Sequence, residues 1–313
     1  MQNTYLYVSI NLAIVLKALS KARGFAEQMP ALLVRYGELG LKSPSVRRRF
    51  ENALIDDIRR RHMLAKLPCV ISSTRGRIFV DSDDWRKSCE ILTRTFGVVS
   101  FSPVTEVDSK IESVTKGVLE FARPLLFDGA SFAIRTRRTG NHDYTSQTLA
   151  EKLGSEILAN NKDRGIKVSL SKPDVEIFVE VRERKTYVFS SVLIGPGGMP
   201  LGTQGKMLSI VDSELGIASS WLLMKRGCTV LTAADDSNLV KPLESWCPNL
   251  KIVPPDPDIF ELAKRNGCIG ITLPWTLKEI ERSKPPKGDL PVFYPLVGMN
   301  EEETRGLLDR IKA

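Results

Sequence analysis

Hydrophobic positions along this chain follow two recurring patterns, short apolar runs and stripes spaced for helices. Phe50, Leu54 and Ile58 recur every four residues, which predicts a helix with one buried face. Two arginine triplets, at 47–49 and 59–61, lie in the same stretch. We expect both triplets to stay available to solvent.

The predicted elements fall into three parts. The first has the order strand, helix, strand, strand, helix, which is typical of a ferredoxin-like unit. A second part also mixes strands with helices, and beyond residue 205 the two alternate, which predicts a small parallel sheet covered by helices. The predicted strands are 31–35, 67–72, 76–80, 98–107, 131–136, 175–181, 187–193, 207–211, 229–233, 251–253, 268–272 and 292–294. The predicted helices begin near residues 43, 84, 111, 145, 215, 239, 259, 276 and 301.

A glycine-rich segment, Gly-Pro-Gly-Gly-Met-Pro-Leu-Gly-Thr-Gln-Gly-Lys at 195–206, opens the third part, and Lys225-Arg226-Gly227 ends its first helix. This frame is typical of the approach to a nucleotide-binding loop, where glycines let backbone N–H groups converge on phosphate oxygens. The glycines also suit an interdomain hinge. We favour the hinge for Gly195, Gly197, Gly198 and Gly202.

The frame resembles that of the tRNA 4-thiouridine synthetase family, also known as ThiI, which carries a Ser-Gly-Gly-x-Asp-Ser pyrophosphatase loop between the two flanks. Counting back without gaps from Arg226-Gly227 aligns six residues of this chain with those six positions, and none of the six matches the family's residue. This degenerate loop consists of Val211, Asp212, Ser213, Glu214, Leu215 and Gly216. Residues 32–43 are similar to the family's opening strand, and 135–146 and 171–181 resemble the hallmark segments of a THUMP domain, an RNA-binding module.

The resemblance implies an α+β ferredoxin-like N-terminal domain plus a THUMP domain, followed by a truncated α/β parallel-sheet domain of PP-loop or Rossmann-like type. The implied boundaries are 29–83, 84–195 and 196–313, with 1–28 as a flexible extension that stems from an upstream start codon. The last domain has 118 residues (313 minus 195). A complete pyrophosphatase domain of the family is longer, so we expect strand-helix units to be absent.

The degenerate loop carries two carboxylates where the family places phosphates. A carboxylate about 4 Å from a phosphate charge costs on the order of 4 kcal/mol at an effective dielectric near 20. We therefore predict no cofactor. In the alternative, Asp212 and Glu214 bind Mg²⁺ with ATP, since such ions use one or two carboxylates. A third interpretation is that Asp212 or Ser213 caps the following helix.

Basic residues point to a polyanionic partner. The chain has a net charge of +8, and residues 29–100 hold 14 Lys and Arg against 8 Asp and Glu. Guanidinium groups bind phosphates, and rings stack on unpaired bases. With the resemblance, this predicts contact with the acceptor end of tRNA. The predicted RNA-binding residues are Arg35, Lys42, Arg47, Arg48, Arg49, Arg135, Arg137, Arg138, His142 and Tyr144.

The five cysteines are widely spaced and predict no metal site, only reduced cytosolic thiols. We expect Cys228 and Cys268 to be buried, and Cys247 is the candidate sulfur carrier if the chain is an enzyme. The apolar run at 5–16 is too short to cross a bilayer. A cytoplasmic protein without membrane contact is expected.

Three functions remain open at this point. The leading hypothesis is a tRNA-binding protein of the THUMP/4-thiouridine synthetase type that lacks ATP-dependent thiolation and serves tRNA modification as an adaptor. The alternative is an active tRNA sulfurtransferase that makes 4-thiouridine with ATP and a persulfide donor. In the third, a homodimer partner or a separate modification-enzyme subunit completes the last domain.

Overall fold

The computed structural model describes residues 31–37, 43–74 and 76–313, so that the predicted extension at 1–28 lies outside the described residues. Two compact units form from segments that alternate along the chain. The first unit contains residues 31–34, Leu67–Cys89 and Ser100–Ile194. The second contains Arg35–Lys66, Glu90–Val99 and Gly195–Ala313.

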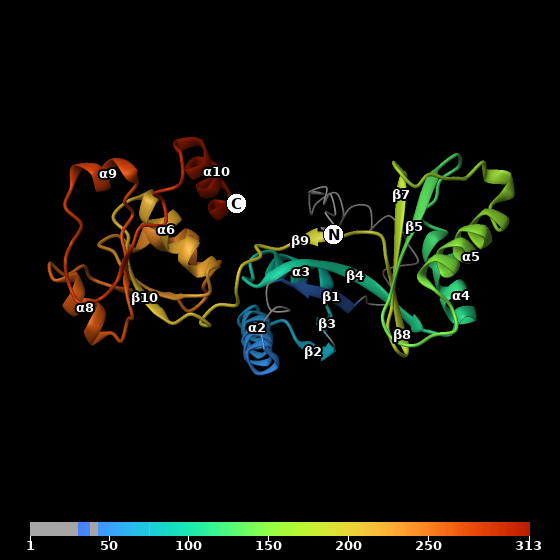
Figure 1. Ribbon diagram of the computed structural model, residues 1–313, viewed down its shortest axis with the longest axis horizontal. Coiled ribbons are helices and arrows are strands. Elements are labelled where there is room, and N and C mark those ends of the chain that lie inside the picture. The colour runs from blue at the N-terminus through green and yellow to red at the C-terminus, as the bar shows by residue number, and fades with distance from the viewer. Residues whose placement is uncertain (1–30, 38–42, 75) are drawn as a thin grey trace. The chain divides into compact units, whose positions relative to one another are not determined.

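The first unit is built on a nine-stranded sheet (Figure 1). Its strands are β1 (Ala31–Tyr36), β2 (Cys69–Thr74), β3 (Arg77–Ser82), β4 (Val98–Asp108), β5 (Ser131–Arg138), β6 (Lys167–Val168), β7 (Val175–Val181), β8 (Lys185–Phe189) and β9 (Leu193–Ile194). They lie in the order β2-β3-β1-β4-β8-β7-β5-β6, and β9 pairs with β4. The strands of the predicted ferredoxin-like and THUMP regions therefore belong to one sheet.

Two helices, α4 (Ile111–Ala122) and α5 (Ser146–Ala159), cover one face of β5 and β7 (Figure 1). The N-cap residue of α5, Thr145, accepts a hydrogen bond from the backbone N–H of Thr148 in a capping box. Leu149 and Leu153, four residues apart, are buried against the sheet. A short 3₁₀ helix, η2 (Lys162–Arg164), follows, and α3 (Trp85–Thr93) runs across the boundary between the units.

The second unit contains the predicted parallel sheet, in the order β12-β11-β10-β13-β14. Its strands are β10 (Lys206–Ile210), β11 (Thr229–Ala233), β12 (Lys251–Val253), β13 (Ile271–Thr272) and β14 (Val292–Phe293). Its helices are α2 (Pro44–Leu64), α6 (Glu214–Lys225), α7 (Ser237–Glu244), α8 (Ile259–Arg265), α9 (Leu277–Arg282) and α10 (Glu301–Lys312). Trp221 of α6 packs against Phe96 and Trp246, with ring centroids 5.3 and 5.2 Å away.

The predicted strand 187–193 is wrong in detail, because β8 ends at Phe189 and a separate strand, β9, begins at Leu193. Both pair with β4, Thr105 opposite Val188 and Ser100 opposite Ile194. Between these two pairs the segment that joins β8 to β9 has one residue more than the part of β4 opposite it, as in a β-bulge. Strand β6 was not predicted, since two exposed residues carry no periodicity.

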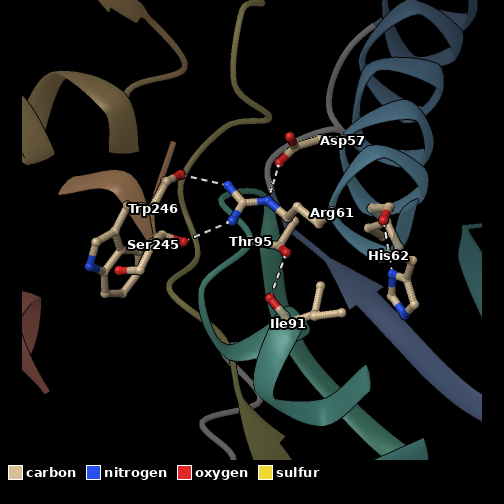
Figure 2. Close-up of polar contacts among 8 residues, drawn as sticks. Asp57, Arg61, His62, Ile91, Thr95, Ser245 and Trp246 are labelled. Carbon is tan, nitrogen blue, oxygen red and sulfur yellow. Dashed lines mark hydrogen bonds and ion pairs between the residues drawn. The ribbon is translucent and has the colours of Figure 1, made fainter. Parts of the chain in front are cut away.

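Arg61 corrects the expectation that both arginine triplets are available to solvent, because it is only 5% exposed. Its guanidinium Nε donates to Asp57 at 2.9 Å, and its Nη atoms donate to the carbonyl oxygens of Ser245 and Trp246 at 3.1 and 2.5 Å (Figure 2). Arg61 lies three residues after Ile58, and its burial follows from the same helical periodicity. Arg59 and Arg60 are exposed, as expected.

Candidate nucleic-acid interface

Basic side chains gather at one edge of the first unit, where β5 ends and β7 turns into β8. The two strands β5 and β7 are parallel, and Arg138 lies opposite Val181. Because the carboxyl ends of parallel strands meet at the same edge, the end of β5 lies beside the turn at 182–184. We call Arg77, Arg137, Arg138, Arg182, Arg184 and Lys185 the basic edge.

A buried carboxylate anchors the basic edge. Glu180 is 4% exposed, and its Oε1 atom lies 3.1 Å from Arg77 Nε and 2.5 Å from Arg182 Nη2. Burial lowers the pKa of Arg77, and Glu180 opposes that shift. Two cations thus surround one buried anion, so the cluster keeps a net positive charge. Arg182 is held by charge-assisted hydrogen bonds to Glu180, and Arg77 is held by an ion pair.

A small pocket of about 200 Å³ opens in the basic edge. Its lining includes the hydroxyl-bearing residues Thr74 and Thr139, the cations Arg182, Arg184 and Lys185, and one carboxylate, Glu183. Tyr187 also lines it, and burial together with the nearby Glu106 carboxylate, to which its hydroxyl is hydrogen-bonded, raises the pKa of this phenol to about 12. Hydroxyl and guanidinium donors around a space of this size suit a phosphate group.

Two arginines of the basic edge, Arg137 and Arg184, are exposed. Among the described residues, no side chain forms a hydrogen bond or ion pair with Arg137 or Arg184, and both are exposed. By contrast, Lys185 pairs with Glu106 at 2.6 Å. Arg138 donates to the Gly140 carbonyl oxygen at 3.1 Å. Arg137 and Arg184 are therefore the side chains best placed to reach an external phosphate.

Three of the predicted RNA-binding residues in this unit have structural contacts. Arg135 donates to Glu176 at 3.0 Å and to the Leu170 carbonyl oxygen at 2.6 Å. The hydroxyl of Tyr144 donates to the Ser109 carbonyl oxygen at 2.7 Å, and burial raises its pKa. The His142 ring stacks on Tyr144, with centroids 5.4 Å apart. These contacts hold the segment after β5 in place beside Arg137 and Arg138.

The remaining predicted RNA-binding residues belong to the second unit or lie outside the described residues. Arg35 is half-buried at the end of β1, and Lys42 is outside the described part of the chain. Arg47, Arg48 and Arg49 are exposed on the first turns of α2. The Arg49 guanidinium lies 5.3 Å from the Phe50 ring centroid.

Sequence reasoning missed Arg77, Arg182, Arg184 and Lys185 as members of the basic edge. The signal was available for three of them, because the charged segment Arg-Glu-Arg-Lys at 182–185 directly follows a strand. What the sequence did not reveal is that this strand runs parallel to β5 and directly beside it. Arg77 comes from β3, and only the complete sheet brings it to Glu180.

Of the residues in the predicted degenerate loop, 211–213 connect β10 to α6 in the second unit, and 214–216 form the first turn of α6. Val211 is buried, and its backbone N–H donates to the Ala233 carbonyl oxygen at 2.9 Å, which extends the sheet ladder. A Cβ atom on Gly216 would lie 2.7 Å from the Val211 Cα atom, so this glycine permits close packing of helix on strand. Two of the six loop residues therefore serve the packing of the sheet and its helix.

The charged side chains of the loop have partners within the second unit. Glu214 is paired with Lys312 of α10 at 2.5 Å. Ser213 is at the N-cap position of α6 without a side-chain cap, and its hydroxyl donates to Asp212 at 2.9 Å. No group of three metal-ligating side chains occurs in the part of the chain that the structure describes.

The glycine-rich segment is held by backbone hydrogen bonds. Gly197 exchanges them with residues 97 and 98, at 2.9 and 2.8 Å, and Met199 donates to the Lys225 carbonyl oxygen at 3.0 Å. Gly198 has φ +75°, and a Cβ atom there would lie 2.1 Å from that carbonyl oxygen. Close backbone approach explains this glycine, whereas we expected it to serve a hinge.

The three cysteines of the α/β part are buried. Burial raises the thiol pKa of Cys228, Cys247 and Cys268. Reactive cysteines have a low pKa, because the thiolate is the nucleophile. None of these three thiols has a lowered pKa. The expected burial of Cys228 and Cys268 is confirmed.

Comparison with known proteins identifies two domains. Residues 31–102 match the ThiI ferredoxin-like domain, and residues 108–191 match the THUMP domain. The basic edge draws Arg137, Arg138, Arg182, Arg184 and Lys185 from the THUMP match and Arg77 from the ferredoxin-like match. No described helix is long and apolar enough to span a membrane.

Curated relatives are named as probable tRNA sulfurtransferases. That of Methanothermobacter thermautotrophicus is 38% identical over 212 residues, which cover 66% of this chain and 52% of the relative. That of Methanosarcina acetivorans is 29% identical over 341 residues, covering 92% and 82%. This chain thus spans about half the length of the first of these relatives.

Two solved structures share the fold over 91% of this chain. The crystal structure of PH1313 from Pyrococcus horikoshii has a TM-score of 0.77, with 28% identity and all of that chain covered. The crystal structure of a 4-thiouridine synthetase in complex with RNA and bound ATP has a TM-score of 0.70, with 21% identity and 85% of that chain covered.

Proposed function

Since the chain belongs to the ThiI family by its ferredoxin-like and THUMP domains, we propose that it is a tRNA-binding protein that acts in tRNA modification without thiolating tRNA itself. The observation that carries this proposal is the basic edge, with Arg137 and Arg184 exposed beside a phosphate-sized pocket. Phosphate contacts of this kind dominate nucleic-acid affinity. The acceptor end of tRNA is the part that we expect it to hold.

The proposal that ATP is not used rests on the degenerate loop. The N–H group of Val211 is already bonded within the sheet, and Asp212 and Glu214 place negative charge where phosphates would lie. The buried, protonated thiol of Cys247 supports the same conclusion, since a sulfur carrier needs an accessible thiolate. The chain would then serve as an adaptor, alone or with a modification-enzyme subunit.

The RNA-binding proposal is tested by titrating bulk tRNA with the wild type and with the double variant Arg137→Ala/Arg184→Ala. Both substitutions are at exposed positions, so the variant should fold. We expect its affinity to fall about tenfold, because two phosphate contacts are lost. The control is Lys116→Ala/Lys152→Ala, which removes the same charge from α4 and α5. Equal affinity of the two double variants would contradict the proposal.

The second test is calorimetry with ATP and Mg²⁺. We expect no heat of binding at micromolar protein concentration, because a carboxylate near a phosphate costs on the order of 4 kcal/mol. Micromolar affinity that is lost on substitution of Asp212 by Ala would instead favour an active sulfurtransferase with a carboxylate-bound Mg²⁺. In that case, expression of this protein in a strain that lacks its gene should restore 4-thiouridine, as measured by mass spectrometry of the tRNA nucleosides.

A further inference from the structure

A pocket of about 890 Å³ lies in the second unit, at the edge of the parallel sheet where the strands begin. Met207 at the start of β10, Cys228 just before β11 and Ile269 just before β13 line it. The degenerate loop leaves the opposite, carboxyl end of β10, so this pocket is distinct from the loop position. The volume is in the range of small-molecule sites, which is about 300–1,000 Å³.

The polar lining of this pocket is cationic. Lys225 and Arg226, at the end of α6, both line it, and none of the described lining residues is acidic. The last carbonyl groups of this helix are hydrogen-bonded within the chain. Met199 N–H donates to the Lys225 carbonyl oxygen at 3.0 Å, and Cys228 N–H donates to that of Leu223 at 3.1 Å.

The apolar lining offers a platform at the pocket mouth. Phe293 is 44% exposed and Ile269 is 56% exposed, although both are large apolar side chains. A Cβ atom on Gly270 would lie 3.1 Å from Phe293 Cε2, so the ring lies against the backbone there. An aromatic ring placed in this way suits stacking of a base.

We propose that this pocket binds one unpaired nucleotide of an RNA strand, its base against Phe293 and Ile269 and its phosphate beside Lys225 and Arg226. The inference rests on the proposed function, because that function supplies RNA as the ligand. A Mg²⁺-bound triphosphate fits less well, since such complexes use carboxylate ligands and the lining has none. A single phosphodiester charge matches the two cations.

The test uses a fluorescein-labelled decauridylate and fluorescence anisotropy at fixed salt. Phe293→Ala and Arg226→Ala change exposed side chains, and a thermal melt verifies that each variant is folded. We expect Phe293→Ala to weaken binding about fivefold or more, because base stacking is lost. The control is Phe127→Ala, a 57% exposed phenylalanine of the first unit, which should bind as the wild type does. Wild-type affinity for both pocket variants would overturn the inference.

Photocrosslinking locates the base directly. The same oligonucleotide carrying 5-iodouridine should give adducts on Phe293 or Tyr294, and adducts confined to the first unit would overturn the inference. Uridine 5′-monophosphate that binds the pocket as tightly as the oligonucleotide would assign it to a free nucleotide instead. If the wild type does not bind tRNA at all, the proposed function is wrong. If it binds tRNA but the pocket variants bind the oligonucleotide as the wild type does, only this inference is wrong.

Discussion

Arg61 has the same chemistry as its neighbours Arg59 and Arg60, yet only Arg61 is buried. Three of its five N–H donors bond to one carboxylate and two backbone carbonyl groups, those of Asp57, Ser245 and Trp246. The carbonyl groups follow α7, where a helix end carries negative partial charge that a cation stabilises. The Asp57–Arg61 pair thus fixes helix α2 to the chain after α7 within the second unit.

Substitution of Arg61 by alanine should destabilise the protein by about 3–5 kcal/mol, because it leaves a buried carboxylate and two carbonyl groups without partners. Arg60→Ala, at the adjacent exposed position, should change the free energy of unfolding by about 0.5 kcal/mol or less. Urea denaturation of both variants measures the difference. Similar stabilities would mean that the buried pair contributes little.

Individual residues show what the sequence could and could not predict. The stripe of Phe50, Leu54 and Ile58 was predicted and is buried, and the same periodicity reaches Arg61, so its burial was predictable in principle. The basic character of 135–138 was also visible. The role of Arg77 was not, because its partner Glu180 is about a hundred residues away in sequence and no local rule connects them.

At the scale of elements, the alternation of strands and helices predicted the parallel sheet of the second unit. The β-bulge before β9 was not predictable, because its cause is the pairing of one long strand, β4, with two short ones. The glycine-rich segment was recognised, but its role depends on contacts with residues 97–98 and with Lys225. Patterns along the chain predict elements well and their distant contacts poorly.

The contacts of the glycine-rich segment predict different effects for two adjacent glycines. Gly197→Ala should cost about 1 kcal/mol, since the position has φ +67° but open space around the new Cβ atom. Gly198→Ala should cost about 3 kcal/mol or more, because its Cβ atom would also clash with the Lys225 carbonyl oxygen. Thermal melts of the two variants compare them. If the segment were a loose hinge, the two melting temperatures would be alike.

For the molecule as a whole, the proposed RNA binding involves two kinds of surface. The basic edge offers guanidinium groups and hydroxyl donors for phosphates, and the pocket of the second unit offers a ring and two cations. The net charge of +8 favours encounter with a polyanion in either case. The family resemblance predicted RNA binding, whereas the location of the two surfaces required the structure.

The salt dependence of tRNA binding tests the central claim most directly. The dissociation constant is measured from low to high KCl for the wild type and for Arg137→Ala/Arg184→Ala. We predict steep weakening with salt for the wild type, and a log–log slope about 1.4–1.8 smaller in magnitude for the variant, because each of the two lost phosphate contacts contributes about 0.7–0.9. Absent or salt-insensitive binding, or an unchanged slope in the variant, would contradict the account.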